Sequence, residues 1–430
     1  MDITALPRIP FRAGAAKVSI TPKDDFFPCT TFEDVHLCGV CMPIYVRAIA
    51  LDNGEKRVVI LEFELLAVPR RRALRQRISE ALCIPPENVF LAATHNHSIL
   101  PIPDEDGLIK ISTPVDPQVE KLAALCEEQG VLAARKALES AVPARVGFNT
   151  GFSYINVNRD QCYIDGYDEG FDFSAPSDKT VTLLRFETLS GQPIALWSNY
   201  AVHPNCEVLA GCENDQAKIS GDLAGITSKY LEDRYPGAVA LWSNGAEGNQ
   251  NPIVKNYCPV FNADGSHTWG KIGEGIRMYN EALGTQLALD ILALEKGMTF
   301  DESLSVSLAK DSINLPGMQI KESTVGTLPN GKWEMEVADP VEVRFQMLAL
   351  NDIVFFFISG EPVTQIGMHL KKVSPAKHTV IVGISDGHSG YFPDEHGYEN
   401  HTFEYYLSKV RHCPTDAFTD IFMKMYQALT

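Results

Sequence analysis

The chain lacks an apolar run long enough to cross a membrane. A spanning helix needs about 18 or more consecutive apolar residues, and the longest candidate, residues 353–358, has only the length of a buried strand. Residues 1–8 also lack the basic segment followed by an apolar one that marks a secretion signal. We therefore expect a cytoplasmic protein without stable membrane association.

Positive charge is scarce as well. The 430 residues include 37 Lys and Arg against 55 Asp and Glu, which gives a formal net charge of -18. A chain of this sign repels nucleic acid and anionic lipid surfaces. We expect a small-molecule substrate as the main partner and no nucleic acid, and the composition leaves a homo-oligomer open.

The ten cysteines are too widely spread for a disulfide-stapled scaffold, which fits a reducing compartment. Cys38 and Cys41 have the spacing of a redox or metal-binding pair. No second pair follows, and no thioredoxin-like helix pattern comes after it. Both are therefore predicted to be ordinary buried thiols.

Neither an internal repeat nor a long linker interrupts the chain, so we expect one domain over residues 1–430. Apolar segments predict strands at residues 11–22, 44–51, 57–66, 89–93, 144–151, 180–187, 193–203, 238–243, 304–308, 342–350, 353–358 and 379–384. Helical spacing predicts helices at residues 70–82, 117–140, 223–235, 272–294, 361–372 and 415–429, with Asp116 and Asp222 placed as caps. This mixture predicts an α/β fold with a mixed β-sheet core flanked by helices.

Two histidines follow one of these strands directly. Residues 89–93 are apolar without a charge, and His95 and His97 come next at a spacing of two. In extended chain that spacing puts both rings on the same side. Neutral imidazole is the commonest protein ligand for zinc. The pair is either a metal site or a polar strand end without a metal.

Three further elements end or begin with similar chemistry. His203 follows the strand at residues 193–202, Glu361 stands at the start of a helix whose amino end favours a carboxylate, and residues 379–384 run into a segment that ends at Tyr391. A core histidine, a capping acid and a turn would each explain one of them. Together with His95 they indicate one site assembled from distant parts of the chain.

The order of motifs resembles that of the neutral, or non-lysosomal, ceramidases and their bacterial relatives, over nearly the whole chain. The matching segments are residues 13–22, Thr94-His95-Asn96-His97-Ser98, Asn199-Tyr200-Ala201-Val202-His203-Pro204, Ile219-Ser220-Gly221-Asp222, Gly360-Glu361 and Ser389-Gly390-Tyr391. The resemblance implies a Zn²⁺ ion held by His95, His203, Glu361 and Tyr391.

The resemblance also implies two residues beside the metal. His97 lines the pocket, and it could move a proton or only orient a ligand through a hydrogen bond. Arg159 falls where a family arginine faces the substrate, so it could hold an anionic oxygen or a carboxylate. Zinc with an open coordination position lowers the pKa of water toward about 7 and polarises a carbonyl.

Several positions depart from the family pattern, among them residues 99–103, which replace glycines after the first histidine motif. Gly248-Asn249-Gln250-Asn251-Pro252 matches a loop whose serine has been assigned a catalytic role, and Asn251 stands at the serine position. An amide cannot be a covalent nucleophile, so Asn249 and Asn251 are predicted to contact the substrate instead. Phe403 replaces a family tyrosine near the site, and we expect it to line the same pocket.

We therefore expect a zinc-dependent hydrolase in which water cleaves an amide, or an ester or lactone, of a small polar substrate. The chain stops where the family's immunoglobulin-like domain would begin and lacks an export signal, which argues against ceramide as the substrate. Two alternatives stay open. One is a zinc-dependent lyase, isomerase or cyclase at the same site, and the other is a non-catalytic binding protein on the same scaffold.

Overall fold

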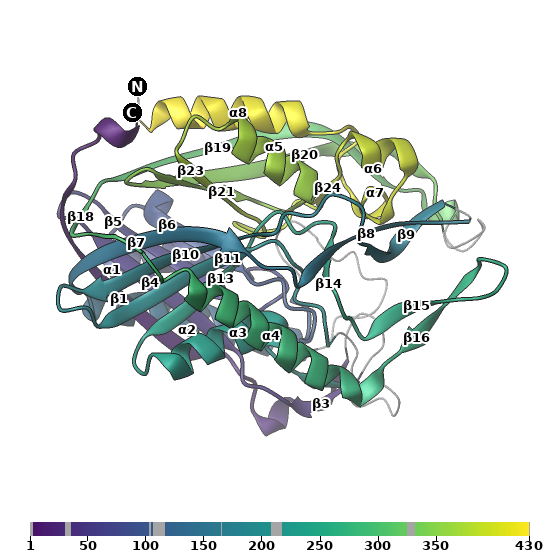
Figure 1. The fold of residues 1–430 in the computed structure, drawn as a ribbon, viewed down its shortest axis with the longest axis horizontal. Coiled ribbons are helices and arrows are strands. Elements are labelled where there is room, and N and C mark those ends of the chain that lie inside the picture. The colour runs from purple at the N-terminus through teal and green to yellow at the C-terminus, as the bar shows by residue number, and fades with distance from the viewer. Residues whose placement is uncertain are drawn as a thin grey trace.

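The computed structural model describes residues 3–30, 36–102, 105, 117–164, 166–207, 217–324 and 332–429. Two mixed β-sheets lie face to face between two layers of helices (Figure 1). The α/β fold with a mixed sheet core and flanking helices is thus confirmed, with two such sheets instead of one. The expected cap Asp116 lies outside the described residues.

The larger sheet follows the order β13-β11-β10-β7-β1-β4-β5-β6, with β17 on β7 and β18 on β1. Only β11 with β13 and β5 with β6 pair in parallel. In that order its strands are Val239–Asn244, Pro193–Tyr200, Thr180–Thr188, Val142–Phe152, Ile9–Ser19, Tyr45–Asp52, Arg57–Phe63 and Val89–Ala93, with β17 at Phe300–Asp301 and β18 at Ser303–Leu304.

The smaller main sheet follows the order β19-β20-β21-β23. Its strands are Val306–Ile320, Met335–Leu350, Ile353–Ile358 and His378–Val382, and β21 pairs with β23 in parallel. Its inner face meets the larger sheet in one apolar layer, in which Trp197 stacks on Phe355 at 4.3 Å between ring centroids. Because β21 is covered on both faces, it reads as a continuous apolar run.

Helices cover the outer faces of both sheets. On the larger sheet lie α1 (Arg71–Leu82), α2 (Gln118–Glu139), α3 (Asp222–Arg234) and α4 (Ile276–Ala293), and on the other lie α5 (Thr364–Val373) and α8 (Thr415–Ala428) (Figure 1). Each sheet is therefore covered by helices on its outer face and by the other sheet on its inner face.

None of the described helices combines the length and apolar character that a membrane crossing needs.

Short strands and helices gather at one end of the sheets. They are β2 (Cys29–Thr30), β3 (His36–Val40), β8 (Asn156–Tyr163), β9 (Gly166–Asp172), β12 (Ala217–Ile219), β14 (Gln250–Pro252), β15 (Tyr257–Phe261), β16 (His267–Lys271), β22 (Glu361–Pro362), β24 (Tyr391–Phe392), α6 (Glu395–Asn400) and α7 (Phe403–Leu407). The sequence patterns did not predict β8, β9, β15 and β16. Cys38 and Cys41 are exposed, so the prediction of buried thiols is wrong for them.

The helix predicted from residue 361 begins only at Thr364. The backbone N–H of Glu361 donates to the Gly390 carbonyl at 3.0 Å, and that of Val363 donates to the Phe392 carbonyl at 3.1 Å. These bonds make the segment a short strand, β22, parallel to β24. The prediction that a helix amino end holds the Glu361 carboxylate is therefore wrong.

Asp222 caps α3 at one amide, because its Oδ1 accepts from the Leu223 backbone N–H at 2.6 Å. It is the first helical residue, with φ of 49°, and the helix begins without a side-chain cap bond at Gly221. Its carboxylate accepts from the Ser98 hydroxyl at 3.0 Å and from the Glu207 backbone N–H at 2.9 Å. Asp222 therefore ties the histidine segment to the chain that follows His203.

One carboxyl group is buried in β5. Glu62 lies on the same face of the strand as Val58 and Ile60, and neither carboxylate oxygen has a hydrogen-bond partner among the described residues. Burial raises the pKa of Glu62 well above its usual value of 4.5. The folded protein therefore keeps a proton that the unfolded chain releases, so this residue's contribution to stability falls as the pH rises above 4.5.

We expect Glu62→Gln, which cannot ionise, to gain stability relative to the wild type as the pH rises above 4.5. Urea unfolding of both proteins at a series of pH values measures the difference. Glu55→Gln is the matched control, because Glu55 is exposed. Parallel stability curves for the wild type and Glu62→Gln would contradict a buried, neutral Glu62.

Candidate metal centre

His95 and His97 lie just beyond β6, where the chain turns. Asn96 holds the turn, because its amide donates to the Ser220 carbonyl at 2.6 Å and accepts from the Ser98 backbone N–H at 2.8 Å. His95 has φ of 61°, so the expected extended geometry is wrong at this point. The turn still brings the two rings together, with 4.7 Å between their centroids.

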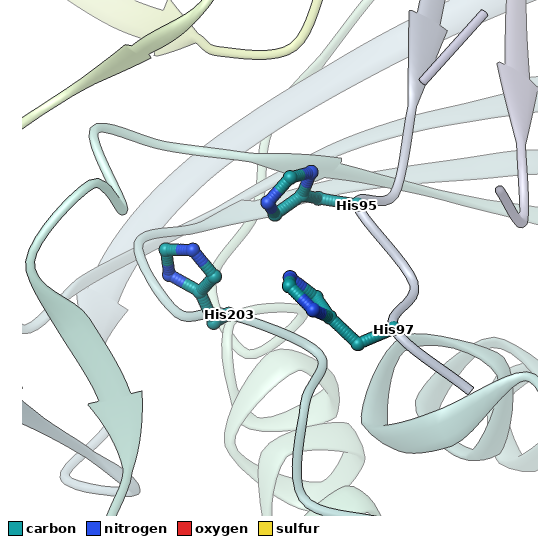
Figure 2. A group of neighbouring side chains, drawn as sticks. All are labelled: His95, His97 and His203. Atoms are coloured by element: carbon teal, nitrogen blue, oxygen red, sulfur yellow. The ribbon is translucent and has the colours of Figure 1, made fainter. Parts of the chain in front are cut away.

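His203 joins this pair from the end of β11. It is buried, and its ring centroid lies 5.0 Å from that of His95 and 5.7 Å from that of His97. Figure 2 shows the three rings pointing toward one another. The nitrogens of His95, His97 and His203 are close enough together to hold one metal ion.

Glu361 and Tyr391 reach the histidines from the paired strands β22 and β24, in which they are direct neighbours. Glu361 Oε2 lies 2.9 Å from His203 Nε2 and 3.2 Å from His95 Nε2. The Tyr391 hydroxyl lies 3.3 Å from His203 Nε2. The structure thus brings all four residues predicted as ligands into one cluster.

The protonation of the histidines tests whether a metal ion fits. His95 Nδ1 lies 2.9 Å from the Leu66 carbonyl oxygen, and His203 Nδ1 lies 3.2 Å from the Gln250 carbonyl oxygen. Each Nδ1 must carry the hydrogen that it donates, so in a neutral ring each Nε2 presents a lone pair. Both lone pairs face one oxygen of Glu361, an arrangement that is repulsive unless a cation lies between them.

The charges in the cluster agree with this argument. Burial and Arg159 lower the pKa of His203 to about 3, so at neutral pH a proton does not supply the cation. Two neutral imidazoles and a carboxylate are ligands that suit zinc. The donor set therefore fits a divalent metal ion.

Tyr391 and His97 complete the inner surface of the cluster. Burial and Glu361 raise the pKa of Tyr391 well above its usual value, so the hydroxyl keeps its proton. Burial, together with His95 and His203, lowers the pKa of His97 well below its usual value. His97 is half-buried while His95, His203, Glu361 and Tyr391 are buried. His97 is therefore the most exposed of these five side chains.

Arg159 enters from β8 and is itself buried. Nε donates to Glu404 Oε1 at 2.7 Å and Nη2 donates to the Gly248 carbonyl at 2.5 Å, while Nη1 lies 3.4 Å from His203 Nε2. The guanidinium also lies over the rings of Tyr391 and Phe403, at 5.5 and 4.9 Å from their centroids. Nη1 is therefore the part of Arg159 that faces the cluster.

Asn249 and Asn251 have partners within the protein. The Asn249 oxygen accepts from the Thr364 backbone N–H at 2.9 Å, and its nitrogen donates to Asp160 Oδ2 at 2.9 Å. Asn251 donates to Glu169 Oε1 at 3.0 Å and accepts from Asn205 at 3.3 Å. These bonds hold β14 and its loop in place, so substrate contact by either amide stays a prediction.

His388 and Glu404 were missed in the sequence analysis. His388 Nε2 lies 2.5 Å from Glu361 Oε1, and the pair together with His95 forms a second group that could hold a metal ion. His388 stands three residues before Tyr391 in a glycine-containing segment that reads as a turn. No pattern in the sequence around Glu404 indicates a role at the site, because its partner Arg159 is distant in the chain.

Asp386 anchors the loop that carries His388 and Tyr391. Its buried carboxylate lies 2.5 Å from Arg75 Nη1 and 3.5 Å from Arg71 Nη1, and its backbone carbonyl accepts from Arg344 Nη2 at 3.0 Å. Arg71, Arg75 and Arg344 are buried as well. Removing the charge of Asp386 would take the carboxylate counterion away from the buried Arg75 guanidinium.

We expect Asp386→Asn to lower the free energy of unfolding by about 3–5 kcal/mol, as for other broken buried ion pairs. Urea denaturation measures the change. The matched control is Asp352→Asn, because Asp352 pairs with Lys377, whose side chain is 66% exposed. That variant should lose about 1 kcal/mol or less. Equal losses in the two variants would contradict the anchoring role.

Comparisons with known proteins agree with the fold and motif order. Residues 32–264, more than half of the chain, match the family model described as neutral/alkaline non-lysosomal ceramidase, N-terminal. Neutral ceramidase A of Dictyostelium discoideum is 30% identical over 183 residues, which is 39% of this chain and 24% of that protein. The match thus spans about a quarter of the relative's length.

Two solved structures resemble the whole chain. The crystal structure of neutral ceramidase from Pseudomonas aeruginosa matches with a TM-score of 0.71 and 17% identity, over 98% of this chain and 74% of that one. A structure of a ceramidase complexed with C2 matches with a TM-score of 0.72 and 16% identity, over 98% and 75% of the two chains. At these identities the likeness concerns the fold.

Proposed function

The chain belongs to the neutral/alkaline non-lysosomal ceramidase family, and we propose that it hydrolyses an amide bond at the cluster of His95, His203 and Glu361. The observation that carries the proposal is the pair of imidazole lone pairs facing Glu361 Oε2 at 2.9 and 3.2 Å. We propose zinc as the metal, held by these three residues with Tyr391 beside them. When bound, such an ion polarises a carbonyl and lowers the pKa of water.

His97 is placed to move the proton. It is the half-buried member of the cluster, and its Nε2 has no hydrogen-bond partner among the described residues. A neutral imidazole can accept a proton from the attacking water and pass it to the leaving amine. Its position beside His95 and His203 keeps this transfer next to the scissile bond.

Arg159 and Tyr391 are placed to stabilise the oxyanion that forms when water adds to the carbonyl. Arg159 Nη1 and the Tyr391 hydroxyl lie 3.4 and 3.3 Å from the same His203 nitrogen. Both are donors, and Glu404 fixes the guanidinium from behind. Donors held in place before charge develops lower the barrier most effectively. Since Asn251 occupies the position of the family serine, water attacks directly.

We propose a small polar amide as the substrate, not ceramide. Polar and charged side chains gather beside the cluster: Glu169 bonds to Asn251 and Lys255, and its carboxylate lies 3.9 Å from Arg159 Nη1. Long alkyl chains would remove these charged groups from water, which is costly. The described cysteines form no disulfide, which supports a cytoplasmic location.

Heavy-oxygen water tests the reaction class. The purified protein is incubated with a panel of polar N-acyl amines, esters, lactones and a short-chain ceramide, after its metal content has been measured. We expect stoichiometric zinc and one solvent oxygen in the product acid of a polar amide. A metal-free protein, or a product without solvent oxygen, would overturn hydrolysis. Turnover of ceramide alone would overturn the proposed substrate.

A further inference from the structure

The two oxygens of Glu361 have different neighbours. Oε2 faces His203 Nε2 at 2.9 Å and His95 Nε2 at 3.2 Å. Oε1 faces His388 Nε2 at 2.5 Å. All four side chains are buried, so water does not screen one contact more than another.

The distances from the two Glu361 oxygens to the imidazole nitrogens indicate that Oε2 binds the metal and that Oε1 accepts a hydrogen bond. Two atoms that bind one zinc ion at about 2.0–2.1 Å lie roughly 2.8–3.4 Å apart at the usual coordination angles. Both contacts of Oε2 fall within that range. The contact of Oε1 with His388 Nε2 is shorter than that range. It is therefore a hydrogen bond from an imidazole N–H to a carboxylate, and hydrogen bonds to a charged acceptor are among the strongest in proteins.

Resting on the proposed function, we propose that His388 is a positioning residue for the metal ligand Glu361. Its Nε2–H holds Oε1, so that Glu361 binds the metal through Oε2 alone. A carboxylate without this bond can rotate and bind through both oxygens. The second oxygen would then take the coordination position that a reactant needs.

The backbone holds His388 in the required place. The Ser389 N–H donates to the Ser359 carbonyl at 2.8 Å, and the Glu361 N–H donates to the Gly390 carbonyl at 3.0 Å. These bonds tie the loop of His388 directly to the segment of Glu361. Asp386 and Gly387 take positive φ values of 53° and 100°, and the buried arginines described above anchor Asp386.

Cobalt(II) is the probe for the test, because its visible absorption weakens as its coordination number rises. We expect His388→Ala to bind Co²⁺ about 10–100-fold more weakly than the wild type, as happens when hydrogen-bond partners of other metal ligands are removed. The visible absorption of the bound Co²⁺ should also be weaker. His388→Gln keeps an N–H donor and should recover part of both properties. His412→Ala, at an exposed position, should match the wild type.

Copper(II) electron paramagnetic resonance distinguishes positioning from ligation. We expect the number of coupled nitrogens to stay the same in His388→Ala and His388→Gln. Loss of one nitrogen would make His388 a ligand and overturn the proposal, as would unchanged affinity and absorption in both variants. If the wild type itself binds neither Co²⁺ nor Cu²⁺, the proposed function fails first. Circular dichroism shows which variants are folded. If His388→Ala does not fold, the result for His388→Gln decides the test.

Discussion

Replacing His203 with alanine is expected to remove the metal ion and to lower amide hydrolysis by about 10³-fold or more. His203 Nε2 is the nitrogen that faces Glu361 Oε2 most closely, at 2.9 Å, and it also lies 3.3 Å from the Tyr391 hydroxyl. Without it, a metal ion keeps His95 and Glu361 but loses the ligand that joins them to Tyr391. Metal analysis after dialysis and kcat/KM on the best amide measure the two effects.

Two controls separate metal loss from unfolding. His412→Ala removes an exposed imidazole and should keep full metal content and activity. His203→Gln fills most of the buried volume, so its melting temperature shows whether the fold survives without the ligand. A His203→Ala protein that is folded and still holds stoichiometric zinc would disprove the proposed centre.

The sequence predicts best those elements whose burial leaves a local pattern. The strands at Val89–Ala93 and Ile353–Ile358 are recognisable because both faces are covered and every residue is apolar. Strand β8 is polar although mostly buried, and strands β9, β15 and β16 are partly exposed. All four form by pairing with each other or with β14. Such pairing depends on partners that the local sequence does not reveal.

At the site, the secondary structure of residue 361 likewise depends on a strand partner that the local sequence does not reveal. Helical spacing of the apolar residues after it predicted a helix start, but two backbone bonds to the Tyr391 segment make it a strand. That pairing places Glu361 beside Tyr391, and no pattern within either segment indicates it. The ends of apolar elements grouped His95, His203, Glu361 and Tyr391 in the sequence, and the motif resemblance then implied that they bind a metal. His388 belongs to no matched motif, and only its 2.5 Å contact with Glu361 reveals it.

His97→Ala is expected to lower kcat by about 10²–10⁴-fold, the usual contribution of a general acid or base, while metal content stays near that of the wild type. His97 lies 4.7 and 5.7 Å from His95 and His203 between ring centroids, yet it makes none of the close contacts with Glu361 that those residues make. Its position therefore suits proton transfer better than ligation. Parallel assays of metal content and kcat check both parts.

The comparison with His203→Ala makes this result informative. Because His97 can also share a metal ion with His95 and His203 geometrically, loss of metal together with activity would assign it to the coordination sphere. An unchanged kcat would remove it from the chemistry and leave only an orienting role. Retained metal with a slow chemical step, in a variant that melts like the wild type, is the outcome that a proton-transferring His97 requires.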